Sequence, residues 1–499
     1  MKKDFKKIFS AVTALALCCT FAFSLSEQTG LKFSENKVYA EETSDTFIND
    51  NQTYGITADE PTELPTYAPT EPPTEPPTEP PTEPPTEPPS TSVSTTTTTA
   101  TPSSDGLVFE TSDDYAAVVD CDESVTSVIV PETYEGLPVK KISAEAFAEC
   151  YFMTNIILPE SITTIEYRAF EKCERLISIE IPEGVTEIPY YAFSECSSLS
   201  SVIIPESVTC ISSYAFNFCS SLKNIVLPDS VITISDHAFN YAGLTSITLS
   251  KNLESIGSQS FYHCDELTEI TFPESLKTIG GEAFRFSGLV EVNLPDNIKS
   301  IAEYSFSDCY DMTDLTIGNG ITNIADRAFY NCTHLKNVTI GNKVARIGSN
   351  AFDRNKCLEE IVIPYNVKAI NGAAFCHCEN LKRIVIKNPN CEIYDSDFII
   401  CNKFIDNSGY YAYYGVIVGH ENSAAQQYAD KYSRRFEAVS CGDINCDGEI
   451  TISDVVLFQQ ALANKKVNEA LVLYVLDVNH DEKFDVFDLI TIKRMVLNT

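Results

Sequence analysis

A phenylalanine recurs through the middle of this 499-residue chain at a nearly constant interval. The eleven gaps between successive members measure 22 or 23 residues. We call these twelve residues the ladder phenylalanines: Phe147, Phe170, Phe193, Phe216, Phe239, Phe261, Phe284, Phe306, Phe329, Phe352, Phe375 and Phe398. A fixed period of roughly 20–50 residues indicates a solenoid, in which each repeat forms one turn and packs on its neighbours. A fold built around a single compact core gives no such period.

Each repeat also carries the pattern of a short β-strand. Most repeats continue to a leucine and then to apolar residues two apart, as in Leu199, Val202 and Ile204. A period of two is typical of a strand with one buried face. A proline or glycine such as Pro205 ends the strand, and a Val/Ile-x-x-Ile segment leads into the next Ala-Phe. We therefore predict a β-rich solenoid with one parallel strand per turn of about 23 residues.

The end turns of a solenoid need caps because each has a neighbour on one side only. The candidate caps are residues 107–138 in front and residues 415–439 behind. In the second segment, residues 424–432 are predicted to form a closing helix. The solenoid with its caps is therefore assigned to residues 105–439.

A cysteine follows nine of the ladder phenylalanines at a distance of three residues. These are Cys150, Cys173, Cys196, Cys219, Cys264, Cys309, Cys332, Cys378 and Cys401. Ala242, Ser287 and Asn355 take the position in the other three turns. Replacement by alanine and serine favours a small packed residue, so we interpret the column as interior reduced thiols. Bridging between neighbouring turns is the alternative, and identical thiols in a line offer no tetrahedral metal cage.

Two surfaces of the solenoid could contact a ligand. The outward strand positions are largely β-branched and lack aromatic rings, which plain strand propensity explains. They are Glu180, Ile203, Val226, Thr248, Thr271, Asn293, Thr316, Thr339, Val362 and Val385. A tyrosine strip just before the Ala-Phe is a candidate for glycan contact, with ordinary edge packing as the alternative: Tyr167, Tyr190, Tyr191, Tyr214 and Tyr304. Neither surface identifies the ligand.

The Ala-Phe-x-x-Cys-x-x-Leu unit and the closing helix resemble the BspA-type leucine-rich repeats of bacterial surface proteins. The resemblance covers residues 107–439. It implies a right-handed solenoid used for adhesion or ligand capture, and it brings no catalytic residue.

The N-terminal part is predicted to lie outside any folded domain. Lysines followed by an apolar run from Ile8 to Phe23 indicate a secretory signal peptide, so residues 1–40 are assigned to signal peptide and leader. An uncleaved anchor and a lipoprotein at Cys18 or Cys19 are the alternatives. Residues 41–104 are assigned to a disordered Pro/Thr/Glu-rich linker, because 13 of the 25 prolines fall between Pro61 and Pro89.

Two acidic loops near the C-terminus have the spacing of EF-hand calcium loops. Oxygen ligands stand at loop positions 1, 3, 5, 7, 9 and 12, which is the set that calcium requires. The first loop supplies Asp443, Asn445, Asp447, Glu449, Thr451 and Asp454, with Gly448 at the turn. The second, 34 residues later, supplies Asp477, Asn479, Asp481, Lys483, Asp485 and Asp488, with Glu482 in place of the glycine. We predict two Ca²⁺ sites, each followed by a helix (residues 455–463 and 489–496). Whether Glu482, which replaces the turn glycine, weakens the second site is left open.

This duplicated unit, from residue 440 to residue 499, resembles a type I dockerin. The resemblance rests on Gly442-Asp443-Ile444-Asn445 and on the repeated loop and helix. It implies a small all-α module that binds a cohesin of a scaffolding protein. The family's recognition positions fall on Ile452, Ser453, Gln459 and Gln460 in the first half and on Val486, Phe487, Lys493 and Arg494 in the second. The two faces differ, and we expect the second to dominate.

Together these features predict a secreted, non-catalytic component of a cellulosome-like complex at the cell surface. A net charge of −36 argues against nucleic-acid binding, and no stable membrane span is expected. The first alternative is a calcium-binding cell-surface adhesin that grips host or bacterial proteins or glycans. The second is a glycoside hydrolase or other carbohydrate-active enzyme, disfavoured because no pair of carboxylates forms a recognisable cleft motif.

Overall fold

The computed structural model describes residues 104–405, 410–439, 442–444, 449–464, 476, 478 and 485–498. The predicted signal peptide and leader, and the linker up to residue 103, lie outside the described residues. In the described part no helix is both long and apolar enough to cross a membrane.

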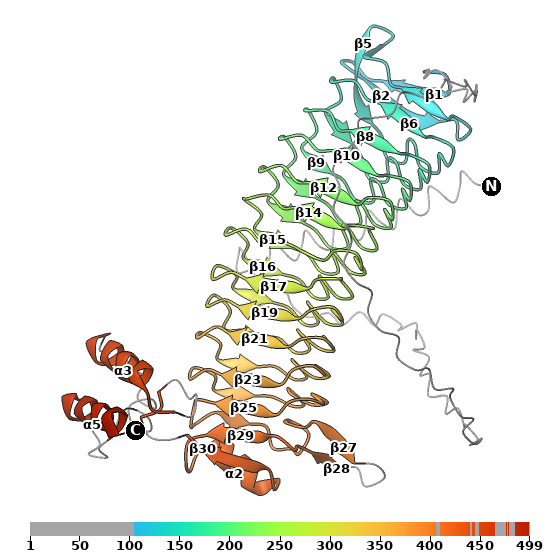
Figure 1. The fold of residues 1–499 in the computed structure, drawn as a ribbon. Coiled ribbons are helices and arrows are strands. Elements are labelled where there is room, and N and C mark those ends of the chain that lie inside the picture. The colour runs from blue at the N-terminus through green and yellow to red at the C-terminus, as the bar shows by residue number, and fades with distance from the viewer. Residues whose placement is uncertain are drawn as a thin grey trace, which may run out of the picture. The chain divides into compact units, whose positions relative to one another are not determined.

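The N-terminal cap is a small mixed sheet that leads directly into the solenoid (Figure 1). Strand β1 (Leu107–Thr111) pairs antiparallel with β2 (Ala116–Cys121), and β2 pairs parallel with β5 (Leu137–Ile142). Strand β4 (Thr133–Tyr134) forms a hairpin with β5, and β5 pairs parallel with the first short strand of the next turn. Phe109 of β1 stacks on Tyr134 of β4 at a centroid distance of 4.2 Å. The predicted front cap is therefore a folded element.

The solenoid contains about 14 turns of parallel strands. In most turns one strand follows the Phe, Cys and Leu positions of the repeat. This first series comprises β3 (Ser127–Ile129), β6 (Asn155–Ile157), β8 (Ser178–Glu180), β10 (Ser201–Ile203), β12 (Asn224–Val226), β14 (Ser246–Thr248), β17 (Glu291–Leu294), β19 (Asp314–Ile317), β21 (Asn337–Ile340), β23 (Glu360–Ile363) and β25 (Arg383–Ile386).

Most turns hold a second, two-residue strand where the sequence pattern predicts a turn. It forms where the Val/Ile-x-x-Ile segment ends, and its isoleucine is buried in nearly every turn. The two apolar residues of this segment are three positions apart, so they lack the alternation with a period of two by which a strand is recognised. The series is β7 (Thr164–Ile165), β9 (Glu187–Ile188), β11 (Cys210–Ile211), β13 (Thr233–Ile234), β15 (Ser255–Ile256), β16 (Thr278–Ile279), β18 (Ser300–Ile301), β20 (Asn323–Ile324), β22 (Arg346–Ile347), β24 (Ala369–Ile370) and β26 (Glu392–Ile393).

The first series is interrupted between β14 and β17, where residues 267–273 form no strand. This turn carries Phe272 at the place where other turns have isoleucine or leucine. The ring is buried and lies edge-on to Phe284 at 5.6 Å. We attribute the loss of strand geometry to this larger side chain.

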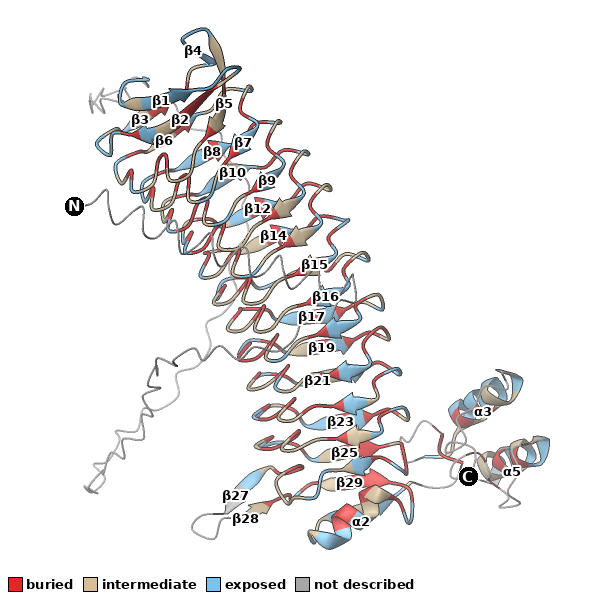
Figure 2. Ribbon diagram, turned by 180° about the vertical axis from the view of Figure 1, so that it is seen from behind, coloured by how far each residue is buried: buried red, intermediate tan, exposed pale blue. Residues whose placement is uncertain are grey.

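The core of the solenoid is a continuous stack of the ladder phenylalanines. From Phe147 to Phe375 each ring is fully buried, and neighbouring centroids lie 5.0–5.6 Å apart with planes within 14° of parallel. Figure 2 shows the buried positions running along the turns while the outward strand positions stay exposed. Phe398 leaves the stack and contacts Tyr411 instead, at 6.0 Å. The periodic spacing therefore overstates the stack by one residue, because the chain turns into the C-terminal cap there.

The cysteine column is a line of hydrogen-bond donors as well as small packed side chains. Seven interior thiols, Cys173, Cys196, Cys219, Cys264, Cys309, Cys332 and Cys378, donate to the carbonyl of the ladder phenylalanine of the preceding turn at 3.1–3.2 Å. Asn355 takes the same role through Nδ2, at 3.1 Å from the Phe329 carbonyl. Burial raises the pKa of the Cys309 thiol to about 12, which keeps it protonated as a donor.

Two turns are one residue shorter than the rest, and each contains a glycine against the preceding turn. A Cβ at Gly243 would overlap the carbonyl oxygen of Ser220, and one at Gly288 would overlap that of Asp265. The shorter path pulls the backbone inward, so only glycine fits. These are the turns in which Ala242 and Ser287 replace the column cysteine.

We therefore expect Gly243→Ala to destabilise the solenoid by at least about 1–3 kcal/mol, as overpacking against fixed backbone does. Urea unfolding of the full chain would measure the change. Gly372→Ala is the matched control, because no atom lies within 4 Å of the Cβ it would gain. Equal midpoints for the two variants would contradict the interpretation.

The C-terminal cap closes the rod with two further parallel strands and a helix. Strands β27 (Lys403–Ile405) and β28 (Tyr410–Ala412) form a hairpin, and β29 (Val416–Gly419) and β30 (Arg435–Ala438) extend the sheet beyond β25. Helix α2 (Ala424–Lys431) lies between β29 and β30. The Ser423 hydroxyl caps it by accepting from the Gln426 amide, and Tyr428 donates to the Ser396 carbonyl at 2.9 Å. The predicted closing helix is confirmed and ends one residue earlier than expected.

Two helices follow in the C-terminal module, α3 (Ile452–Asn464) and α5 (Val486–Asn498). Both begin three residues before the predicted starts of residues 455 and 489. The closing aspartates of the two loops, Asp454 and Asp488, already belong to the first helical turn. Acidic side chains are favourable there because of the helix dipole.

Candidate calcium and docking site

The last aspartate of the first loop ties the two ends of that loop together. Asp454 is fully buried; its Oδ1 accepts from the Ile444 amide and its Oδ2 from the Thr451 amide, both at 2.8 Å. Loop positions 2, 9 and 12 are thereby joined by one carboxylate. Hydrogen bonds to a carboxylate are about twice as strong as those between neutral groups.

The second loop repeats this arrangement atom for atom. Asp488 is fully buried, and its two oxygens accept from the amides of Val478 and Asp485 at 2.9 Å. Each partner lies 34 residues after its counterpart in the first loop. The duplication read from the sequence is therefore also a duplication of hydrogen bonds.

The loops and the module core are physically linked. Ile444 and Val478, whose amides the two carboxylates hold, are both buried. They pack in one small cluster with Phe458 of α3, Ile492 of α5 and Leu476. Opening a loop would therefore withdraw an apolar residue from a core that has few others.

The structure describes half of the predicted calcium ligands. Asp443, Glu449, Thr451, Asp454, Asp485 and Asp488 lie in the described residues. The others, Asn445, Asp447, Asp477, Asn479, Asp481 and Lys483, lie outside them, as does Glu482. Asp443 is buried beside Gly442, whose φ of +100° suits glycine at the entry to the loop. Buried carboxylate oxygens at positions 1 and 12 are the hard donors that Ca²⁺ takes, so the residues present fit this ion.

All eight predicted recognition residues are exposed on α3 and α5. Ile452 is 71% exposed, Val486 51% and Phe487 62%. Ser453, Gln459, Gln460, Lys493 and Arg494 are also exposed. Each residue of the first set has its equivalent 34 positions later in the second. The sets are alike in position and different in chemistry.

Sequence reasoning missed one further exposed apolar pair. Val456 is 44% exposed and its equivalent Ile490 is 40% exposed. Each lies four residues after the first recognition position of its helix, Ile452 or Val486, and therefore on the same helical face. An i, i+4 search for apolar residues along the helices would have found them.

The solenoid presents a mostly exposed outward column, as predicted. Ile203 and Val226 are 56% and 65% exposed on neighbouring turns. Val385 is the exception and is fully buried. It packs against Val418, with Val416 and Val439 around them, because the C-terminal cap covers this end of the sheet.

The predicted tyrosine strip is partly assembled, and three of its five rings have neighbours over their faces. Tyr191 stacks on Tyr214 at 4.5 Å, and Tyr214 stacks on His237 at 4.3 Å. Tyr190 lies edge-on to Tyr191 at 4.3 Å. Tyr304 lies on a different part of the rod, between Arg285 and Arg327, each 5.3 Å from its ring. A sugar stacks on an open ring face, so Tyr191, Tyr214 and Tyr304 suit contact between turns better than glycan binding. Tyr167 and Tyr190 are 42% and 43% exposed.

A second aromatic column, missed from the sequence, flanks the ladder on its other side. Phe218 stacks on Tyr241 at 4.8 Å, Tyr241 on His263 at 4.6 Å, and His263 on Phe286 at 4.3 Å. Its members stand two residues after the ladder phenylalanines and have positive φ. That constant offset is the signal that would have found it.

Comparison with known proteins agrees with this architecture. The family described as BspA type leucine rich repeat region (6 copies) matches residues 140–264, 187–313, 232–358 and 278–405, which together span just over half of the chain. The dockerin type I domain family matches residues 441–497. No curated protein sequence matches the chain.

Several solved structures are similar to the chain. A leucine-rich repeat protein from Bacteroides ovatus is 22% identical, with a TM-score of 0.42, over 67% of this chain and 99% of its own. A leucine-rich cell surface protein from Faecalibacterium prausnitzii is 24% identical, with a TM-score of 0.37, over 60% and 97%. The pneumococcal vaccine antigen PcpA is 17% identical, with a TM-score of 0.42, over 67% and 98%.

Type I dockerins bind calcium and cohesin modules, and both matched families are typical of extracellular or cell-surface proteins. The repeats account for the stacked parallel turns, and the second family accounts for the duplicated loops with their closing aspartates. This chain therefore belongs to the BspA-type leucine-rich repeat proteins and carries a type I dockerin domain at residues 441–497.

Proposed function

We propose that the protein is a secreted, non-catalytic component of a cellulosome-like, polysaccharide-degrading complex. It docks on the cohesin of a scaffolding protein through its calcium-loaded dockerin and presents the solenoid as a binding surface. The observation that carries the proposal is the pair of buried closing aspartates, Asp454 and Asp488, each bonded to two loop amides. The helices that start at these aspartates carry the exposed recognition positions.

Calcium would be held by the oxygen ligands of the two loops, and its charge would offset the clustered carboxylates. With the loops closed, Asp454 holds the Ile444 amide and thereby keeps the Ile444 side chain in the core. Asp488 does the same for Val478. The core then fixes α3 and α5, whose starts present Ile452 and Val486 to a partner. Cohesin binding would in this way depend on both loops.

The second face of the dockerin should dominate the affinity. It pairs the exposed apolar residues Val486 and Phe487 with the cations Lys493 and Arg494. An exposed aromatic residue that becomes buried on binding is typical of interface hot spots, which contribute about 2 kcal/mol or more. We expect Phe487→Ala to weaken cohesin binding by about thirtyfold or more in calorimetric titration, and its equivalent Ser453→Ala to change it by less than about twofold. A larger loss for Ser453→Ala would reverse the assignment.

Calorimetric titration of the full chain against a panel of cohesins, with calcium and with EDTA, tests the docking function. Tight binding that EDTA abolishes is the expected result. Calcium uptake without binding to any cohesin would favour the second candidate, a calcium-binding surface adhesin, which the exposed apolar residues Ile203 and Val226 on neighbouring turns would suit. Release of reducing ends from cellulose or xylan by the purified chain would overturn the non-catalytic assignment.

A further inference from the structure

The last member of the cysteine column is placed differently from the seven interior ones. Each interior thiol donates to the carbonyl of a ladder phenylalanine. Cys401 faces a second cysteine that lies outside the column, Cys376. The two lie where the last regular turn meets the C-terminal cap.

The two sulfur atoms of Cys376 and Cys401 lie closer together than non-bonded atoms normally do. The Sγ atoms of Cys376 and Cys401 lie 2.9 Å apart, and both residues are almost completely buried. Non-bonded heavy atoms have their optimum at roughly 3.5–4.0 Å, and a disulfide brings sulfur atoms to about 2.0 Å. The backbone already joins the two segments: Phe375 and Ile400 form a β-bridge, and the Cys401 amide donates to the Phe375 carbonyl at 3.3 Å. Little movement would complete the bond.

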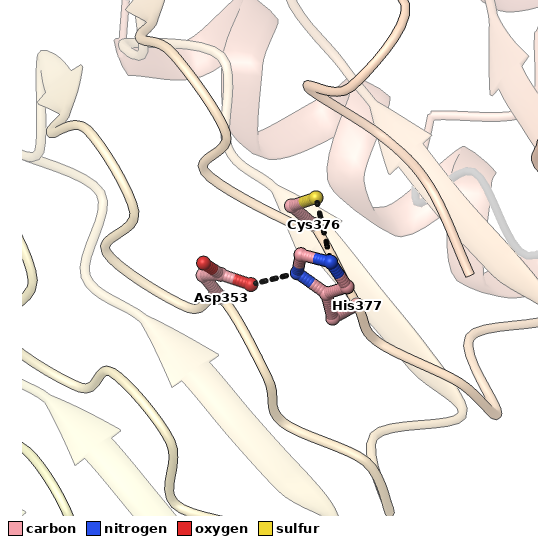
Figure 3. A group of neighbouring side chains, drawn as sticks. All are labelled: Asp353, Cys376 and His377. Atoms are coloured by element: carbon pink, nitrogen blue, oxygen red, sulfur yellow. Dashed lines mark hydrogen bonds and ion pairs between the residues drawn. The ribbon is translucent and has the colours of Figure 1, made fainter. Parts of the chain in front are cut away.

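The neighbouring groups suit the chemistry of a thiol pair. Figure 3 shows His377 between Asp353 and Cys376, with Nδ1 2.9 Å from Asp353 Oδ1 and Nε2 4.0 Å from Cys376 Sγ. The His377 backbone amide donates to Cys401 Sγ at 3.4 Å. The imidazole can accept the Cys376 proton, and the amide stabilises negative charge on Cys401. A shared zinc ion with Zn–S bonds near 2.3 Å would hold two tetrahedral sulfurs about 3.7 Å apart, so the observed spacing favours a direct bond.

We propose that Cys376 and Cys401 form a disulfide in the exported protein, while the seven interior column cysteines stay thiols. The inference rests on the extracellular location proposed above. The two thiols react with one disulfide of an extracytoplasmic oxidant: the first thiolate attacks it and releases one thiol. The second cysteine then attacks the mixed disulfide, so the new S–S bond forms and a second thiol leaves.

The place of the bond has a mechanical reason. An end turn packs on one neighbour only, so it opens more readily than an interior turn. A covalent link from the C-terminal cap to the adjacent regular turn restrains that opening. Because Cys376 and Cys401 are both buried, an oxidant reaches them before the cap closes, and the finished bond is then shielded.

The test is a peptide map of the full chain recovered from an oxidising medium, denatured and alkylated without reductant. We expect linked peptides that contain Cys376 with Cys401. The interior cysteines, such as Cys378, are expected as alkylated thiols. Recovery of Cys376 and Cys401 as two alkylated thiols overturns the proposal. One equivalent of zinc in elemental analysis, together with free Cys376 and Cys401 thiols, overturns the C-terminal disulfide in favour of a metal site.

A matched pair of variants removes ambiguity from the map. Cys376→Ser should leave Cys401 fully alkylated, whereas Cys378→Ser, two residues away in the column, should leave the Cys376–Cys401 peptide intact. Circular dichroism of both variants would show that each is folded. A Cys376→Ser protein in which Cys401 still forms the same linked fraction with another cysteine would also refute the assignment.

Discussion

Replacing Asp443 and Asp477 together with alanine is expected to abolish cohesin binding. Each is the first ligand of its loop, and a calcium site that loses a charged ligand at position 1 keeps too few oxygens to hold the ion. A saturated site contributes about 2.7 kcal/mol when calcium stands at 100 times its Kd. A module whose described core comprises five buried apolar residues has little stability to replace that loss.

Calorimetric titration of the full chain with a cohesin in millimolar calcium would measure this effect. Glu449→Ala is the control, because at loop position 7 the backbone carbonyl serves as ligand and survives the substitution. The double variant should show no heat of binding, and Glu449→Ala should bind within a few-fold of the unaltered chain. Undiminished binding by the double variant would show that docking does not require the loops.

Removal of a single ladder ring should be the most damaging substitution in the solenoid. Phe216 is fully buried between Phe193 and Phe239, with centroids 5.4 and 5.3 Å away. Phe216→Ala leaves a cavity that neighbouring turns cannot close, and buried phenylalanine-to-alanine changes cost about 3–5 kcal/mol. Urea unfolding followed by circular dichroism would measure the loss.

Phe218→Ala is the matched control for that prediction, since it lies two residues away on the same turn and is 46% exposed. Its ring stacks only at the surface, on Tyr241 at 4.8 Å. A loss of about 1 kcal/mol is expected from that contact. If the two variants unfolded at the same urea concentration, the stack would not be the main source of stability.

Much of the fold is predictable because a repeated pattern gives many independent readings of the same turn. The ladder, the strand after it and the closing helix were all predicted from spacing. The second strand was not, because its Val/Ile-x-x-Ile segment lacks a period of two. Phe398 is in period but does not join the ring stack, because spacing alone cannot show where the chain departs into a cap.

The candidate sites were also predictable from the sequence only in part. The closing aspartates could be located from loop spacing, since each loop position has a fixed role. The recognition positions came only from the resemblance to dockerins and stay a prediction. The sulfur pair of Cys376 and Cys401 could not be predicted, because Cys376 stands outside the 23-residue period. The burial of Val385 depends on Val418, which lies on β29, beyond the irregular hairpin of β27 and β28. Contacts between a regular turn and an irregular cap do not follow the repeat, so the repeat cannot predict them.

The bond from each interior column thiol to the preceding ladder carbonyl also affects how such a rod can change its length. Donor and acceptor lie 25 or 26 residues apart in every case. A gene rearrangement that inserts or removes one whole turn therefore leaves every remaining donor opposite an equivalent acceptor. The number of turns can change by duplication while the caps and the dockerin stay unchanged. Such proteins could therefore differ in solenoid length and keep the same ends.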